Sequence, residues 1–110
     1  MSFFAALKKE AEFGRSNAQG LNYKLKVICT LNKAGGIETK EKLCIALSSI
    51  NSEKPHPYFM SHPTVFDVLS KRLDLIVKDG DSYKFKGNLS QDQTKEIMVI
   101  CQKRLRGLKE

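Results

Sequence analysis

The sequence predicts a small, mainly α-helical domain with one β-hairpin, in the α+β class. Apolar residues recur at helical spacing along most of the 110-residue chain. The segment "LIVKDGDSYKFKG", residues 75–87, is the exception, because β-prone residues there flank a tight-turn signal. Strand patterns do not recur elsewhere, so an all-β fold is excluded. The length suits a single domain with a modest core.

Residues 1–20 are predicted to form an N-terminal helix and a turn. Phe3, Phe4, Leu7 and Ala11 make an apolar stripe, with Phe13 as a further candidate, and "GRSNAQG" ends the helix with glycines and polar residues.

The second helix lies in "LNYKLKVICTLNKAGG" and ends at Gly35-Gly36. Ile37 is a candidate for a short extended residue or strand, after which Thr39 can cap the helix "KEKLCIALSSI". The inward positions of the two helices are Leu21, Leu25, Ile28, Leu31, Leu43, Ala46, Leu47 and Ile50.

The segment "NSEKPHPYFM" interrupts this pattern with two prolines, and residues 51–60 can form either a further helical turn or a loop. A third helix of the central region is expected over 62–73, with Pro63 at its first position. Its inward residues are Val65 or Phe66, Leu69 and Leu73. In the hairpin that follows, Tyr83 and Phe85 should face the helices, because an isolated two-stranded hairpin is marginal in water.

Residues 88–110 are predicted to form a C-terminal helix that opens with Ser90 and Gln93 in capping-box spacing. Its apolar stripe is Ile97, Ile100, Cys101, Leu105 and Leu108. Its cations, Lys95, Lys103, Arg104, Arg106 and Lys109, are interpreted as solvated charges.

Cys29, Cys44 and Cys101 are odd in number and lack paired spacing, so we expect buried free thiols in a reducing compartment. No apolar run reaches the roughly 20 residues of a membrane span. The expected protein is soluble and not secreted, and is cytoplasmic, or nuclear in a eukaryote.

From Leu21 to Gly87 the order of elements is helix, short strand, helix, helix and hairpin. This order resembles the winged helix-turn-helix domain, and "VLSKRLDLIVKDGDSYKFKG" carries most of the resemblance. Residues 21–87 would be the winged-helix core, with the hairpin as its wing. The sequence departs from the family where "NSEKPHPYFM" replaces a short turn.

The resemblance implies a double-stranded DNA partner and a role as a transcriptional regulator or as the recognition module of a DNA-processing system. The residues implied to contact DNA come from helix 62–73 and wing 75–86: His62, Thr64, Ser70, Lys71, Arg72, Lys78, Lys84 and Lys86. Asp67 would repel phosphate unless it accepts from a cytosine amino group. The net charge of +7 fits a polyanionic partner.

Two alternatives stay open beside DNA binding. The chain can be a winged-helix-like protein interaction module, and the hairpin lysines can be solvated charges that protect a strand edge. A homodimer through the first and last helices is expected, because their apolar stripes need burial and operators often pair two half-sites.

Catalysis and cofactors are not expected. The sequence has no G-x-S-x-G, no phosphate-binding glycine loop and no H-E-x-x-H. His56 and His62 lack the close ligand pairs typical of zinc sites, so no metal is expected either.

Overall fold

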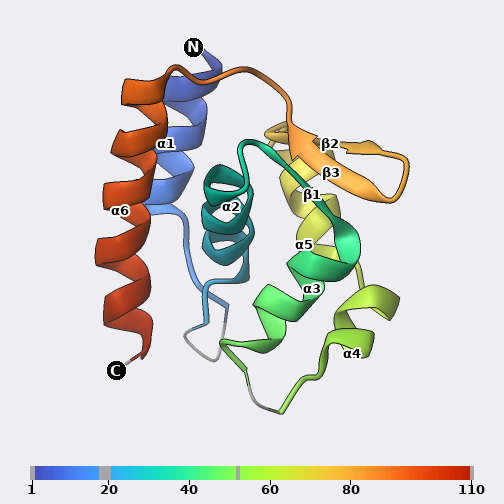
Figure 1. Ribbon diagram of the computed structural model, residues 1–110. Coiled ribbons are helices and arrows are strands. Elements are labelled where there is room, and N and C mark those ends of the chain that lie inside the picture. The colour runs from blue at the N-terminus through green and yellow to red at the C-terminus, as the bar shows by residue number, and fades with distance from the viewer. Residues whose placement is uncertain (1, 18–20, 52, 110) are drawn as a thin grey trace.

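The computed structural model describes residues 2–17, 21–51 and 53–109, with side chains as far as Leu105. Its elements are α1 (Phe3–Phe13), α2 (Tyr23–Lys33), β1 (Ile37–Thr39), α3 (Lys40–Ser48), α4 (His56–Ser61), α5 (Thr64–Asp67), the π-helix η1 (Val68–Arg72), β2 (Ile76–Asp79), β3 (Ser82–Phe85) and α6 (Gln91–Lys109). The predicted α+β class is confirmed. Helices α1 and α6 lie at one end of the molecule, and the sheet lies at the other end with α3, α4 and α5 (Figure 1).

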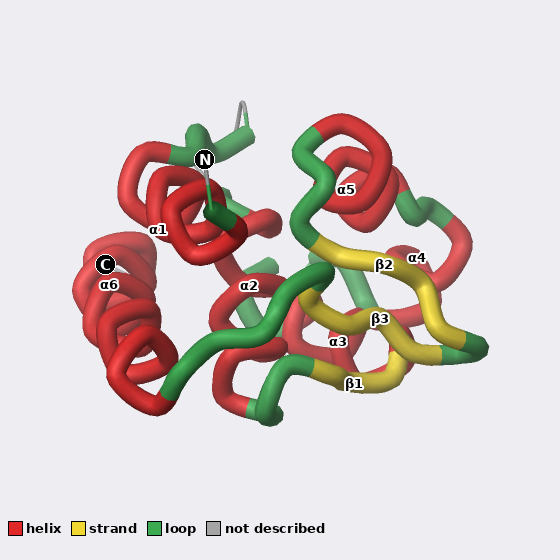
Figure 2. Tube along the Cα trace, turned by 90° about the horizontal axis from the view of Figure 1, so that it is seen from above, coloured by secondary structure: helices red, strands yellow, loops and turns green. Residues whose placement is uncertain are grey.

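The described strands form one antiparallel sheet in the order β1-β3-β2. The hairpin β2–β3 pairs Val77 with Lys84, and β1 adds Ile37 on the other side of the same lysine. The predicted short extended residue at Ile37 is thus a strand of three residues. Since β1 immediately follows α2 and precedes α3, this pairing ties the hairpin to the helices (Figure 2).

The core follows the predicted helical stripes closely. Tyr83 and Phe85 are only 6% and 7% exposed, so the hairpin faces the helices as predicted. Phe66, rather than Val65, is the fully buried residue of the third helix. The predicted inward positions that are fully or almost fully buried are Leu7, Ala11, Leu25, Ile28, Leu31, Leu43, Leu47, Leu69, Ile97 and Cys101.

Several helix ends match the predicted signals. The Thr39 hydroxyl accepts from the Lys42 amide at 3.2 Å. Ser90 and Gln93 form the reciprocal capping box, with bonds of 3.0 and 3.1 Å. Gly35 and Gly36 both have positive φ, at 86° and 101°, a conformation that glycine adopts without a steric penalty.

Some edge positions of the stripes differ from prediction. Phe13 is 73% exposed and does not belong to the α1 stripe. Leu21, Ala46, Ile50, Leu73, Ile100 and Leu105 are only partly buried. The predicted inward position Leu108 lies outside the described side chains.

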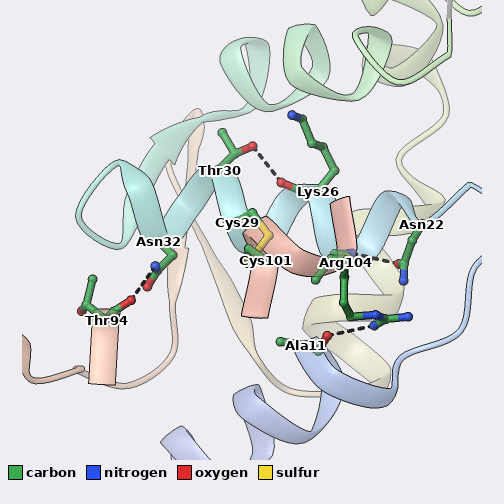
Figure 3. The surroundings of a disulfide bond; sticks show 10 residues. Ala11, Asn22, Lys26, Cys29, Thr30, Asn32, Thr94, Cys101 and Arg104 are labelled. Carbon is green, nitrogen blue, oxygen red and sulfur yellow. Dashed lines mark hydrogen bonds between the residues drawn. A yellow bond between two sulfur atoms is a disulfide. The ribbon is translucent and has the colours of Figure 1, made fainter. Parts of the chain in front are cut away.

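A disulfide joins Cys29 of α2 to Cys101 of α6 across 72 residues of sequence (Figure 3). The prediction of three free thiols is therefore wrong for this pair, and only Cys44 is free and buried. The pair has no local spacing signal, since only the antiparallel docking of α6 on α2 brings the two residues together. The inference of a reducing compartment depended on three free thiols, so it is no longer supported.

Arg104 of α6 closes the C-terminal end of α1. Its guanidinium donates to the carbonyl of Ala11 at 2.8 Å and to that of Gly14 at 2.9 Å (Figure 3). Asn22 donates to the same Gly14 carbonyl at 3.2 Å. The interpretation of Arg104 as a solvated charge is therefore wrong, because it supplies donors and positive charge to a helix C-terminus. Arg106 and Lys109 lie outside the described side chains.

Among the described residues, none of the helices combines the length and the apolar character needed to cross a bilayer.

We expect the disulfide to stabilise the fold by about 4 kcal/mol, from the loop-closure entropy of a loop of this size. The denaturant concentration at which half of the wild-type protein is unfolded should therefore fall when a reductant is added. Cys29→Ser is the control, since its midpoint should not respond to reductant. Equal wild-type midpoints with and without reductant would contradict the stabilising role of the bond.

Arg104→Met should lower the free energy of unfolding by about 1–3 kcal/mol, because two charge-assisted hydrogen bonds to backbone carbonyls are lost. Lys103→Met, on the exposed side of the same helix, should change it by less than about 0.5 kcal/mol. The two variants are compared by urea unfolding, and equal losses would show that Arg104 does not act through the α1 carbonyls.

Candidate nucleic-acid interface

The predicted helix 62–73 is built from two short pieces, α5 and η1. The π-helical turn is marked by a hydrogen bond of 2.9 Å in which the Leu73 amide donates to the carbonyl of Val68, five residues earlier in the chain. Asp74 then adopts a left-handed conformation, with φ of 58°, and sends the chain into the hairpin. Pro63 precedes the first helical residue rather than occupying that position.

Residues 51–60, left open by the sequence, contain the start of a short helix, α4. This helix packs beside α3, and the Lys40 ammonium group donates to the Met60 carbonyl at 3.1 Å. His62 ends α4 and does not belong to the third helix, which corrects its predicted place. Its ring stacks on Tyr58 with centroids 4.2 Å apart.

The inner side of α5 holds the hairpin in place. The Phe66 ring lies parallel to that of Tyr83, with an interplanar angle of 6° and centroids 4.8 Å apart. Leu69 and Ile76 are fully buried beside this contact. The hairpin is therefore docked on α5, which any surface that includes both elements requires.

Most of the residues implied to contact DNA are exposed on α5, η1 and the hairpin, although the register places Lys78 on the Tyr83 side of the hairpin and Lys84 on the opposite side. Thr64, Lys71, Arg72, Lys78, Lys84 and Lys86 are all exposed, and we call this set the α5–hairpin face. Ser70 is partly buried, and its hydroxyl donates to the Phe66 carbonyl at 2.7 Å. The Ser70 hydroxyl is thus engaged within its own helix, and His62 is held by α4 instead.

Three lysines of the α5–hairpin face pair with aspartates. Lys71 lies 3.7 Å from Asp67, and Lys84 lies 3.9 Å from Asp79. Lys86 pairs with Asp74. All six side chains are about half exposed or more, so each pair contributes little to stability.

Arg72 and Lys78 form no ion pair with a carboxylate of the described residues. The α5–hairpin face contains five cations, and residues 62–86 also include the four carboxylates Asp67, Asp74, Asp79 and Asp81, which leaves only a small positive excess. Sequence reasoning considered Asp67 alone. The sequence did not reveal the roles of Asp74 and Asp79. Lys86 is twelve residues from Asp74, and Lys84 lies across the turn from Asp79, so each pair forms only when the hairpin folds.

No group of three or more His, Cys, Asp or Glu side chains in the described part of the chain is arranged to hold a metal ion.

No family model matches this chain, and neither the search of curated proteins nor the search of solved structures found a match.

Two buried acids beneath the face have raised pKa values. Burial raises the pKa of the Tyr83 hydroxyl above its ordinary value of 10.0, and the charges of Asp67 and Cys44 act in the same direction. Burial also raises the pKa of the Cys44 thiol above 9.0, an effect that the positive charge of Lys40 opposes in part. Both groups therefore keep their protons in the folded state at pH values where they ionise in the unfolded state.

We expect the free energy of unfolding to be independent of these groups below about pH 9 and to fall as pH rises above it, because the unfolded state then releases protons that the folded state retains. Urea midpoints at neutral and alkaline pH measure this loss. Tyr83→Phe should reduce the alkaline loss relative to the wild type. Identical pH dependence of Tyr83→Phe and the wild type would show that Tyr83 makes no contribution.

Proposed function

We propose that this protein binds double-stranded DNA as a winged helix, with the α5–η1 segment offered to the major groove and the hairpin β2–β3 acting as the wing. The observation that carries the proposal is the docking of the hairpin on α5 through Phe66 and Tyr83, which leaves Thr64, Lys71, Arg72 and the hairpin lysines exposed. The sheet order β1-β3-β2, with β1 between the first two core helices, supports the same assignment.

The hairpin lysines would contact the phosphate backbone and so supply affinity that is independent of sequence. Thr64 and Lys71 lie on the helix and would be the residues that read base edges. The paired aspartates reduce the attraction to phosphate. Binding by one copy should therefore be weak and strongly salt-dependent, which suits a regulator or a recognition module that acts together with other contacts.

The structure weakens the argument for the homodimer that was expected through the first and last helices. Leu7, Ala11 and Ile97, which lie on the stripes that were to hold it, are buried within one chain. A dimer on paired half-sites would need another surface.

A protein interaction module is the second candidate function. The near balance of charge on the α5–hairpin face favours it, as do the exposed Tyr58 and Met60 on α4, since aromatic residues and methionine are enriched at protein interfaces. Such a module would not bind duplex DNA through the hairpin.

The double variant Lys84→Ala with Lys86→Ala should weaken binding to all duplexes alike. It should also reduce the slope of log affinity against log salt by about 2, since two phosphate contacts are lost. Fluorescence anisotropy with a labelled duplex at several salt concentrations measures both quantities. The opposite change, Asp74→Asn with Asp79→Asn, should strengthen binding.

Charge-matched controls are the double variants Lys9→Ala with Lys95→Ala and Asp92→Asn with Glu96→Gln, at exposed positions of α1 and α6. If the controls change binding as much as the hairpin variants do, only net charge matters and the wing assignment is wrong. If the wild type shows no binding at low salt, the protein interaction module becomes the better account.

A further inference from the structure

The Cys29–Cys101 disulfide joins α2 to α6 and borders a groove between these two helices (Figure 3). The groove has a volume of about 390 Å³, and ligand pockets in proteins begin at about 300 Å³. Both cysteines line it, together with Lys26, Thr30, Asn32, Lys33, Met98, Gln102 and Leu105. None of these residues belongs to the α5–hairpin face, so the groove is independent of the proposed DNA contact.

The two halves of the disulfide have different surroundings. Cys101 is 4% exposed and belongs to the buried core, whereas Cys29 is partly exposed and packs against the edge of that core. Thiol–disulfide exchange attaches the incoming group to the sulfur that is attacked. A group added to Cys29 can lie in the groove, but a group added to Cys101 would have to displace core side chains. Cys29 is therefore the half of the bond that can accept an added group.

The approach to Cys29 is open to an anion. The attacking species in thiol–disulfide exchange is a thiolate. Among the described residues that line the groove, none is a carboxylate. An incoming thiolate therefore meets no repelling charge from these residues.

Helix α6 keeps other contacts when the disulfide opens. The Asn32 side chain donates to the backbone near the start of α6 at 3.0 Å, and Arg104 of α6 donates to two carbonyls at the end of α1 at 2.8 and 2.9 Å. Ile97 is fully buried beneath the same helix. These contacts hold the two thiols near each other, so the bond can form again after it has opened.

We propose that this disulfide is a reversible redox site at which Cys29 exchanges with low-molecular-weight thiols and Cys101 is the resolving thiol. A small thiolate attacks the Cys29 Sγ and forms a new sulfur–sulfur bond with it. The Cys29–Cys101 bond breaks, and its electron pair goes to the Cys101 Sγ, which takes up a proton.

Two reactions can follow from this mixed disulfide. In the reverse step, the Cys101 thiolate attacks the Cys29 Sγ and expels the small thiolate. Alternatively, a second small thiolate attacks the external sulfur, which leaves two protein thiols and a small-molecule disulfide. The covalent link between α2 and α6 would thus follow the thiol–disulfide balance of the surroundings, while the α5–hairpin face stays unchanged.

Two variants separate the sulfurs, because each keeps only one of them. Cys101→Ser leaves Cys29 as a thiol, and Cys29→Ser leaves Cys101. Each folded variant is incubated with oxidised glutathione, and the mixed disulfides are located by peptide mass spectrometry. Cys29 should be modified faster than Cys101 by about tenfold or more, because only Cys29 has room for the added group. Cys44 is fully buried, so its modification would report unfolding.

The wild-type bond is tested with an excess of reduced glutathione. The bond should open while the protein remains folded. A short pulse of N-ethylmaleimide should then label Cys29 and leave Cys44 unlabelled. Removal of glutathione under air should restore the disulfide, which intact mass measures.

A change of charge in the groove tests the route of access. In the Cys101→Ser background, Gln102→Glu should slow the modification of Cys29 about threefold at low salt, because oxidised glutathione is an anion. Lys103→Gln makes the same change in net charge at the next residue, which does not line the groove, and should have a smaller effect. Equal effects of the two changes would overturn the groove as the route.

Three further results would overturn the proposal. The first is modification of Cys101 at the same rate as Cys29 or faster. The second is modification of Cys44 in step with Cys29, since the exchange would then require unfolding. The third is a wild-type bond that opens only under conditions in which Cys44 is labelled too, because the disulfide would then be purely structural.

Discussion

The burial of α2 is the constraint on which the rest of the structure depends. This helix contacts α1, α3, α5, α6 and β1, and Leu25, Val27, Ile28 and Leu31 are almost fully buried among them. Fully burying one such side chain contributes about 1.5–3 kcal/mol. Because these contacts point in different directions around one helix, loss of α2 would separate the sheet end of the molecule from the α1–α6 end.

Helix α6 is held by directional contacts at three points along its length, two of them to α2 and one to α1. The Asn32 side chain contacts the Thr94 backbone near the start of α6, and the Cys29–Cys101 disulfide lies near its middle. Further along, Arg104 reaches across to the end of α1. These directional contacts fix the rotation and register of α6, which apolar packing alone specifies less sharply.

The opposite end of the molecule shows how geometry changes the meaning of a charge pattern. The resemblance to winged helices implied that the lysines of the α5–hairpin face contact DNA, but Asp67, Asp79 and Asp74 lie beside Lys71, Lys84 and Lys86. Exposed pairs of this kind are weak, so a phosphate can still displace a carboxylate. The aspartates nevertheless lower the local potential, so the strength of the proposed DNA binding would depend on how many of these pairs must break.

Local pattern in the sequence determined most of the elements: the helical stripes, the Thr39 cap, the Ser90–Gln93 capping box and the hairpin with Tyr83 and Phe85 turned inward. Each depends on residues a few positions apart, whose spacing alone decides which side chains share a face. Tertiary structure alone decided that Cys29 meets Cys101, that Arg104 caps α1 instead of facing water, and that Asp74 neutralises Lys86. These partners are 12 to 93 residues apart in the sequence, and the free energy that brings them together comes from docking whole elements on α2. Periodicity reports which face of an element is buried, but it carries no information about which other element covers that face.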